Sequence, residues 1–368
     1  MKILHINRNY MDNPLHQLMV EELENVGYSN VVFSPRLHNE KAKVIPKPYV
    51  FACECIKGWH RFFFYYKQKK IFDAAEAAVS VDGFDLIHAY TLFTDGNCAR
   101  NLSKKYGIPY VVAVRNTDVN TFFSKMPHLR QRGVDIMRDA QAVFFLSEAY
   151  RKVVFEKYIP QKYRDELYSK TRIIPNGIDY FWHENAFDGD RHTPEREVKL
   201  VYAGRIDKNK NIPTIQKAMD ILSDKGYSAI LTVVGKIEDA GEYKKIIKHK
   251  NTTYIPPVSK ERLIEIYRSS DVFVMPSFTE SFGLVYAEAM SQGLPVIYTK
   301  GQGFDEQFED GSVGYRVDSH SASSVADGIV RVIVNYETIS RRVPQLSSMF
   351  KWSEIIKEYT SVYDRIKQ

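Results

Sequence analysis

Short apolar runs and longer amphipathic stretches alternate along the whole chain. The runs are rich in Val, Ile, Leu, Phe and Tyr and are bounded by Gly, Pro, Asn or Asp, which is typical of strands buried on both faces of a sheet. The predicted strands are 2–6, 31–33, 86–89, 110–114, 142–146 and 172–174 in the first half, and 200–203, 229–234, 253–255, 272–275, 295–298 and 314–317 in the second.

Stretches with helical spacing lie between the runs, for example 212–225, 261–269 and 283–292. In the first of these, Ile215, Met219 and Leu222 recur on one face of the predicted helix. Alternating strands and helices predict an α/β protein built on parallel sheets with helices on both faces. Ligands of such sheets bind beyond the carboxyl ends of the strands, so site residues are expected in the loops there.

The length of 368 residues indicates two domains, since a domain usually has about 150. We expect a first domain over 1–180, a polar linker over 181–195, a second domain over 196–349, and a terminal helix over 350–368. With 44% hydrophobic and 26% charged residues, the composition excludes a disordered chain, a collagen and a disulfide scaffold. Three cysteines, an N-terminus unlike a signal peptide and no apolar run of about 20 residues favour a cytoplasmic protein.

The net charge of +6 is uneven along the chain. Residues 1–180 hold 26 Lys and Arg against 19 Asp and Glu, whereas residues 181–368 hold 25 against 26. The basic first half predicts that this half binds an anionic partner. The equally weighted alternative is that the excess of positive charge only keeps the protein soluble.

The first candidate site follows the predicted strand that ends at residue 203. It contains Gly204, Arg205 and Lys210, ahead of a helix with Pro213 in its first turn. Glycine allows a ligand to approach the backbone, and the two cations suit a diphosphate. A solvated basic loop is the alternative.

The second candidate site follows the predicted strand 272–275. Glu280 lies in the loop, Gly283 begins a helix, and Glu288 lies farther along that helix. The first backbone N–H groups of a helix lack partners within it and favour phosphate or a developing oxyanion. Two surface glutamates beside an ordinary helix are the alternative.

Together these motifs resemble the retaining glycosyltransferases of family 4, which have the GT-B fold of two Rossmann-like domains facing across a cleft. The resemblance rests on Glu280-x7-Glu288, Gly204-Arg205-x4-Lys210, Ala289-Met290-x2-Gly293-x-Pro295-Val296, Ile174-Pro175-Asn176-Gly177-Ile178-Asp179 and Phe350-Lys351-Trp352-Ser353. It extends from about Arg172 to the end of the chain and implies that the terminal helix returns to the first domain.

The resemblance implies that the second domain binds a nucleoside-diphosphate sugar. Arg205 and Lys210 would hold the diphosphate, Glu288 the ribose and Glu280 the transferred sugar. The backbone N–H groups that would meet phosphate or sugar oxygens belong to Phe282, Gly283 and Leu284. Fixed cations and a helix N-terminus can stabilise the leaving charge, so we expect no metal and no cofactor beside the donor. We interpret Asp188-Gly189-Asp190 as a turn, not as a metal site.

The first half should receive the acceptor. Residues 85–90 resemble a strand of the family that ends in histidine, with Tyr90 in place of that last histidine. Arg115-Asn116-Thr117-Asp118 resembles the family's HGTD loop, with Arg115 in the histidine position. A guanidinium stays protonated and cannot act as a base, so Arg115 is expected to bind an anionic group. Asp118 is expected to orient a hydroxyl and is counted with Glu280, Arg205 and Lys210 as catalytic. The acceptor-side candidates are His88, Arg115, Asn116 and Asp118, with a core histidine as the alternative for His88.

Residues 55–70 are rich in aromatic side chains with cations at both ends. They predict a basic amphipathic helix that rests on an anionic membrane, with a core-facing helix as the favoured alternative. Cys53 and Cys55 are interpreted as structural because no second cluster completes a zinc site.

The sequence thus predicts a retaining, metal-independent hexosyltransferase that builds a cell-surface polysaccharide or glycolipid, in the cytoplasm or at the inner face of the membrane. The reaction is expected to proceed on one face of the sugar, with the leaving phosphate removing the acceptor's proton. The alternatives are a non-catalytic nucleotide-sugar-binding protein and a nucleotide-sugar epimerase with the GT-B fold.

Overall fold

The computed structural model describes residues 1–42 and 44–367 and divides the chain into two compact units. The first unit comprises Met1–Leu146, Tyr150–Asn176 and Trp352–Gln368, and the second comprises Ser147–Ala149 and Gly177–Lys351. The chain therefore changes unit inside the Pro-Asn-Gly segment, a few residues before the predicted boundary at 180.

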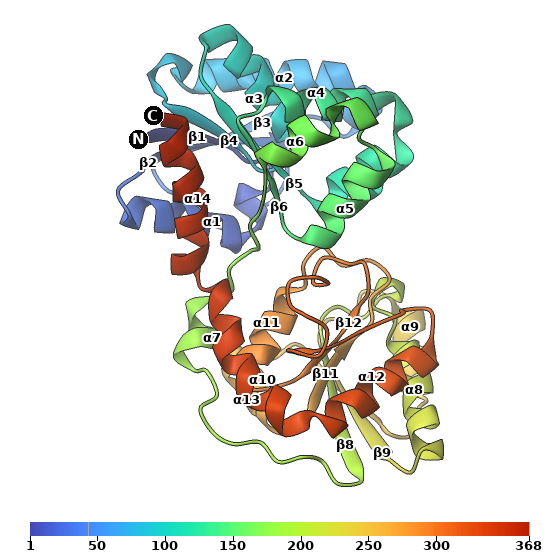
Figure 1. Ribbon diagram of the computed structural model, residues 1–368. Coiled ribbons are helices and arrows are strands. Elements are labelled where there is room, and N and C mark those ends of the chain that lie inside the picture. The colour runs from blue at the N-terminus through green and yellow to red at the C-terminus, as the bar shows by residue number, and fades with distance from the viewer. Residues whose placement is uncertain (43, 368) are drawn as a thin grey trace. The chain divides into compact units, whose positions relative to one another are not determined.

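The first unit is built on a parallel sheet with seven strands among its described residues, in the spatial order β3-β2-β1-β4-β5-β6-β7 (Figure 1). The central strands β4, β5 and β6 are buried along their whole length, which is why their sequences are continuous apolar runs. The strands are β1 (Lys2–Ile6), β2 (Ser29–Leu37), β3 (Val50–Ile56), β4 (Leu86–Ala89), β5 (Tyr110–Val114), β6 (Ala142–Phe145) and β7 (Thr171–Ile173).

Helices connect these strands, and the terminal helix α14 lies beside α1 (Figure 1). The Tyr28 hydroxyl, between α1 and β2, donates to Asp364 Oδ1 of α14 at 2.6 Å. The helices are α1 (Pro14–Asn25), α2 (Phe64–Ala78), α3 (Asp95–Tyr106), α4 (Arg130–Asp139), α5 (Glu148–Lys157), α6 (Arg164–Lys170) and α14 (Trp352–Lys367).

The second unit repeats the plan with six parallel strands in its described part, in the order β10-β9-β8-β11-β12-β13. The strands are β8 (Glu197–Ala203), β9 (Ser228–Val234), β10 (Thr252–Ile255), β11 (Val272–Met275), β12 (Val296–Thr299) and β13 (Gly314–Val317). The helices are α7 (Tyr180–Glu184), α8 (Ile212–Asp224), α9 (Ala240–Ile246), α10 (Lys260–Arg268), α11 (Leu284–Ser291), α12 (Ala322–Val334) and α13 (Tyr336–Leu346).

Each sheet has one point where the direction of strand addition reverses. In the first unit it lies between β1 and β4, and in the second between β8 and β11. The loops that leave these strands diverge to opposite sides of the sheet, and the crevice between them is where open parallel sheets bind ligands. The predicted fold of two Rossmann-like α/β domains is confirmed.

One local prediction was wrong. The region 55–70 is not one helix, because the edge strand β3 continues to Ile56, a 3₁₀ helix covers Gly58–Phe62, and α2 begins only at Phe64. The expected linker 181–195 is grouped with the second unit, and it starts inside α7, where Trp182 is buried with its ring 5.9 Å from that of Tyr267.

Candidate functional site

Two loops are joined at the reversal point of the second sheet. One runs from β8 to α8 and the other from β11 to α11. Asn209 Nδ2 donates to the Thr279 carbonyl oxygen at 2.8 Å, and the Thr279 N–H donates to Asn209 Oδ1 at 3.0 Å. Asn211 Nδ2 donates to the Pro276 carbonyl oxygen at 3.0 Å. These asparagines fix the spacing of the two loops, and the motifs alone did not single them out.

The joined loops bring Lys210 and Glu280 together, and both residues were predicted to bind the donor. Lys210 Nζ lies 2.6 Å from Glu280 Oε2, with 12% and 11% of the two side chains exposed. Asp207 holds the loop by accepting a hydrogen bond from the Lys210 N–H at 3.1 Å. Each charge offsets part of the cost of burying the other, so the two groups can lie together in a largely dry position.

A third segment supports Glu280 from behind. The Glu280 N–H donates to Gln302 Oε1 at 2.9 Å, and the Gly303 N–H donates to the Glu280 carbonyl oxygen at 3.0 Å. A Cβ at Gly303 would lie 1.9 Å from the Ser281 carbonyl oxygen, so only glycine fits this approach. In the sequence this contact corresponds to the Gly301-Gln302-Gly303 turn after β12, which belongs to none of the motifs named above.

Gly283 turns the chain abruptly into α11. Its φ is +78°, and a Cβ there would lie 2.5 Å from the ring of Tyr286. Phe282 is buried with its ring 5.5 Å from that of Phe350, and Leu284 is the first helical residue. The helix therefore begins at the end of the loop that follows β11, where its positive end can act on an anion.

Glu288 lies in the second turn of α11 and is half-buried. Burial raises the pKa of its carboxyl group to about 7, whereas the nearby Lys260 ammonium and a hydrogen bond with Trp182 act to lower that pKa. Trp182 comes from α7, so the expected linker supplies part of the surroundings of Glu288.

Arg205 extends into solvent at the start of the β8–α8 loop. Its side chain is 65% exposed, with Nη2 at 3.8 Å from Asp207 Oδ2. The Tyr202 hydroxyl donates to its carbonyl oxygen at 2.5 Å and fixes the backbone after Gly204. The structure therefore places Arg205 on the predicted loop. The binding of a diphosphate by Arg205 stays a prediction.

His88 lies in β4 inside an aromatic cluster of the first unit. Its ring is fully buried and stacks on Tyr90 at 4.4 Å, and its Nδ1 hydrogen-bonds the Tyr363 hydroxyl of α14 at 2.7 Å. Burial lowers the pKa of the imidazole well below its usual value, so the ring is neutral. This geometry matches the core-histidine alternative, in which His88 fixes the terminal helix.

Arg115, Asn116 and Asp118 follow β5. The Arg115 guanidinium donates to the Tyr90 carbonyl oxygen and to Asn176 Oδ1, both at 3.2 Å, and Asn116 Oδ1 accepts from Asn120 Nδ2 at 2.6 Å.

The buried Asp118 carboxylate accepts three backbone hydrogen bonds. The donors are the N–H groups of Leu92 at 3.0 Å, Phe93 at 3.2 Å and Arg115 at 2.8 Å. Burial raises the pKa of Asp118 to about 6, although these three donors act to lower it. These bonds join the loops after β4 and β5, so Asp118 positions backbone in this structure.

No group of three or more His, Cys, Asp or Glu in residues 1–42 and 44–367 is arranged to hold a metal ion. Asp188 and Asp190 are exposed in an irregular segment between α7 and β8.

Family models match most of the chain. The model for "Glycosyltransferase Family 4" matches residues 17–180, and the model for "Glycosyl transferases group 1" matches residues 185–344. The chain belongs to glycosyltransferase family 4. Lys210 and Glu280 lie in the segment that the group 1 model matches, and Arg115 and Asp118 in the other.

Curated family 4 relatives are distant. D-inositol 3-phosphate glycosyltransferase of an Arthrobacter species is 28% identical over 66% of this chain and 61% of its own length. An uncharacterized glycosyltransferase of Methanocaldococcus jannaschii is 25% identical over 83% of this chain and 80% of its own length. This chain thus spans about three fifths of the first of these relatives.

Solved structures share the fold across nearly the whole chain. Sucrose-phosphate synthase of Thermosynechococcus elongatus superposes with a TM-score of 0.74 at 18% identity, covering 100% of this chain and 99% of that one. HepE of Anabaena, in complex with UDP and glucose, superposes with a TM-score of 0.69 at 16% identity, covering 99% and 100%. At this identity the likeness shows the GT-B fold.

Proposed function

We propose that this protein transfers a hexosyl group, with retention and without a metal ion, from a nucleoside-diphosphate sugar to a saccharide or glycolipid acceptor. The observation that carries the proposal is the buried Lys210–Glu280 pair at the reversal point of the second sheet, beside the start of α11. Family membership and the UDP and glucose in the HepE complex support a nucleotide-sugar donor.

In the proposed reaction the bond from the anomeric carbon to the diphosphate breaks and a bond to the acceptor oxygen forms on the same face. The departing phosphate oxygen takes the acceptor's proton, so atoms and charge balance without a protein base. Lys210, Arg205 and the positive end of α11 stabilise the charge that develops on the diphosphate. Glu280 binds hydroxyls of the transferred sugar, and Glu288 binds the ribose. Synthesis of a cell-surface polysaccharide or glycolipid is the setting that we propose.

A panel of nucleotide sugars tests this function. One donor is expected to raise the unfolding temperature and to be transferred or slowly hydrolysed, with unchanged anomeric configuration in the NMR spectrum and undiminished rate in EDTA. An inverted product contradicts retention, and loss of rate in EDTA contradicts metal independence. Binding without turnover favours the non-catalytic alternative, and conversion of the donor to its epimer favours the epimerase.

We further propose that the first unit docks on an anionic membrane through an aromatic surface at the start of α2. This surface consists of five exposed side chains, Trp59, Phe62, Phe63, Tyr65 and Tyr66. Phe62 is 71% exposed, and Lys69 and Lys70 lie next to the surface. Exposed aromatic rings with neighbouring cations suit the headgroup region of an anionic bilayer. No helix in the described part of the chain is long and apolar enough to cross a membrane.

The double variant Phe62→Ser and Phe63→Ser is expected to lower co-sedimentation with phosphatidylserine vesicles at least fivefold, because it removes the two large apolar rings. Val334→Ser is the control, since Val334 is 73% exposed at the end of α12 in the second unit. Equal vesicle binding by the wild type and the double variant contradicts the membrane proposal.

A further inference from the structure

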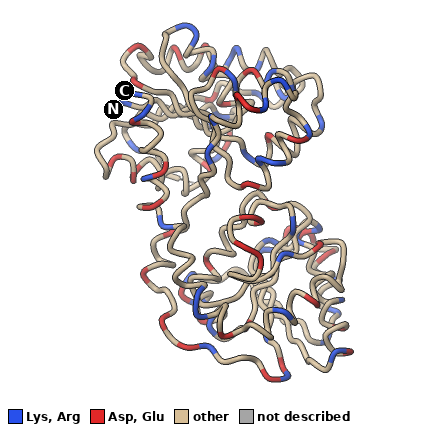
Figure 2. The backbone as a smooth tube through the Cα atoms, in the orientation of Figure 1, with Lys and Arg blue, Asp and Glu red and all other residues tan. Residues whose placement is uncertain are grey.

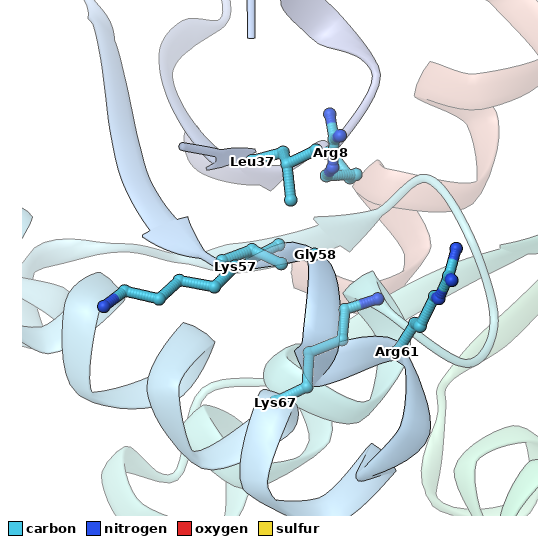
Figure 3. A pocket seen from close by; sticks show the side chains of 7 residues that line it. Arg8, Leu37, Lys57, Gly58, Arg61 and Lys67 are labelled. Atoms are coloured by element: carbon cyan, nitrogen blue, oxygen red, sulfur yellow. The ribbon is translucent and has the colours of Figure 1, made fainter. Parts of the chain in front are cut away.

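A cationic pocket in the first unit lies outside the residues used above. Its volume is about 260 Å³ (Figure 3). It lies between the loop after β1 and the 3₁₀ helix before α2, and its lining residues include four cations and no carboxylate. The lining residues are Arg8, Leu37, Ile56, Lys57, Gly58, Arg61 and Lys67.

The ammonium group of Lys67 is a half-buried charge of this pocket. It makes no hydrogen bond or ion pair with any of the described residues. Burial lowers the pKa of Lys67, the cation of Arg8 lowers it further, and Asp95 and Cys55 act to raise it. A partly buried ammonium without a partner is costly, and an anion bound in the pocket removes that cost.

Arg8 is held in place on the other side of the pocket. Its Nη2 lies 2.7 Å from Glu40 Oε2 and its Nη1 lies 3.5 Å from Asp12 Oδ2. These carboxylates orient the guanidinium and offset part of its charge. Figure 3 shows Arg61 on the same side as the Lys67 ammonium, whereas the Lys57 ammonium points away from the other cations.

A second pocket of about 330 Å³ adjoins the first, because both are lined by Arg8 and Lys67. The rest of its lining is rich in hydroxyl groups, which can both donate to and accept from the hydroxyls of a sugar. The other lining residues are Asn9, Thr91, Thr94, Thr117, Asp118, Thr121 and Phe122. These residues follow β1, β4 and β5, so the second pocket lies at the ligand-binding edge of the first sheet.

We propose that the two pockets together bind a phosphorylated acceptor. Its phosphate or diphosphate group lies among Arg8, Arg61 and Lys67, and its hydroxyl-bearing part lies against the threonines. Guanidinium and ammonium groups on different sides of one pocket match an anion that offers several oxygen atoms. That the anion belongs to an acceptor rests on the proposed function, whereas the binding of the anion does not.

Calorimetric titration with pyrophosphate tests the site directly. It is carried out in the Lys210→Met background so that the donor loops bind the anion weakly. We expect Lys67→Gln and, separately, Arg61→Gln to weaken pyrophosphate binding at least tenfold. Lys104→Gln is the matched control, because Lys104 is exposed on α3 of the same unit and pairs with Asp139 at 3.0 Å. No binding, or equal loss in the control, overturns the proposal.

Two further measurements identify the source of the phosphate. If it is a lipid headgroup, Lys67→Gln also lowers binding to phosphatidic acid vesicles, and if it is a free sugar phosphate, vesicle binding is unchanged. Pyrophosphate binding that depends on Lys67 in a protein without transferase activity contradicts only the proposed function. Transferase activity with no such binding contradicts only the anion site.

Discussion

Replacing Lys210 with methionine is expected to lower kcat/KM for glycosyl transfer about 10²–10³-fold, the usual effect of removing one preorganised donor to a developing charge. The Lys210 ammonium is held 2.6 Å from Glu280 and is largely shielded from water. A cation in such a position interacts more strongly with a leaving diphosphate than an exposed one does. Initial rates with the preferred donor measure the effect.

Two further variants make this test specific for the ammonium group of Lys210. Lys208→Met removes the same charge from an exposed neighbour and is expected to leave the rate within about twofold. Adding Glu280→Gln to Lys210→Met also removes the charge that faced the lost ammonium group, and it is expected to restore the unfolding temperature but not the rate. A rate that recovers together with stability would show that Lys210 acts only by supporting the fold.

Replacing Asp118 with alanine is expected to lower the free energy of unfolding of the first unit by about 3–5 kcal/mol. Three backbone N–H groups lose their shared acceptor, and each unsatisfied buried donor costs about 1–3 kcal/mol before relaxation. Hydrogen exchange is the direct measurement, because the amides of Leu92, Phe93 and Arg115 should lose protection.

Asp82→Ala is the control for this variant, since Asp82 is exposed in a turn before β4 and its loss should change stability by less than about 0.5 kcal/mol. Asp118→Asn keeps one carbonyl oxygen as an acceptor and is expected to fall between wild type and alanine. Normal protection in Asp118→Ala with a large fall in kcat would instead support the catalytic role that the sequence predicts.

The arrangement of the two sheets was predictable because their central strands are buried on both faces, so each is a continuous apolar run. The edge strand β3 was missed for the opposite reason. Its sequence mixes Cys53, Glu54 and Cys55 with larger apolar residues, and most of its positions are half-buried or exposed. Only pairing with β2 makes this segment a strand, and that pairing is not a local property of the sequence.

The Lys210–Glu280 pair was predictable as part of one site because motifs of fixed spacing place both residues after the ends of adjacent strands. The groups that support this pair were not predictable from the motifs. Gln302 and Gly303 contact Glu280 from another loop, and Trp182 reaches Glu288 from a segment that looked like a linker. His88 shows the same limit, since its partner Tyr363 is 275 residues away.

The distribution of charge is informative only at the level of particular pockets. Figure 2 shows that Lys and Arg are spread over many segments of both units, with Asp and Glu interspersed. The net excess of the first half is therefore not one basic face. In the Arg8–Lys67 pocket, the half-buried Lys67 has no carboxylate within ion-pair distance among the described residues.

The hydrogen bond between His88 and Tyr363 affects the order in which the chain can fold during its synthesis on the ribosome. The first unit begins folding first and is completed last, because α14 is synthesised after the whole second unit. Until then His88 in β4 lacks the Tyr363 hydroxyl, and the face of α1 that packs on α14 stays open to solvent. Domains usually complete in order of synthesis. Here the second unit can finish folding before the first unit has received its last helix, α14.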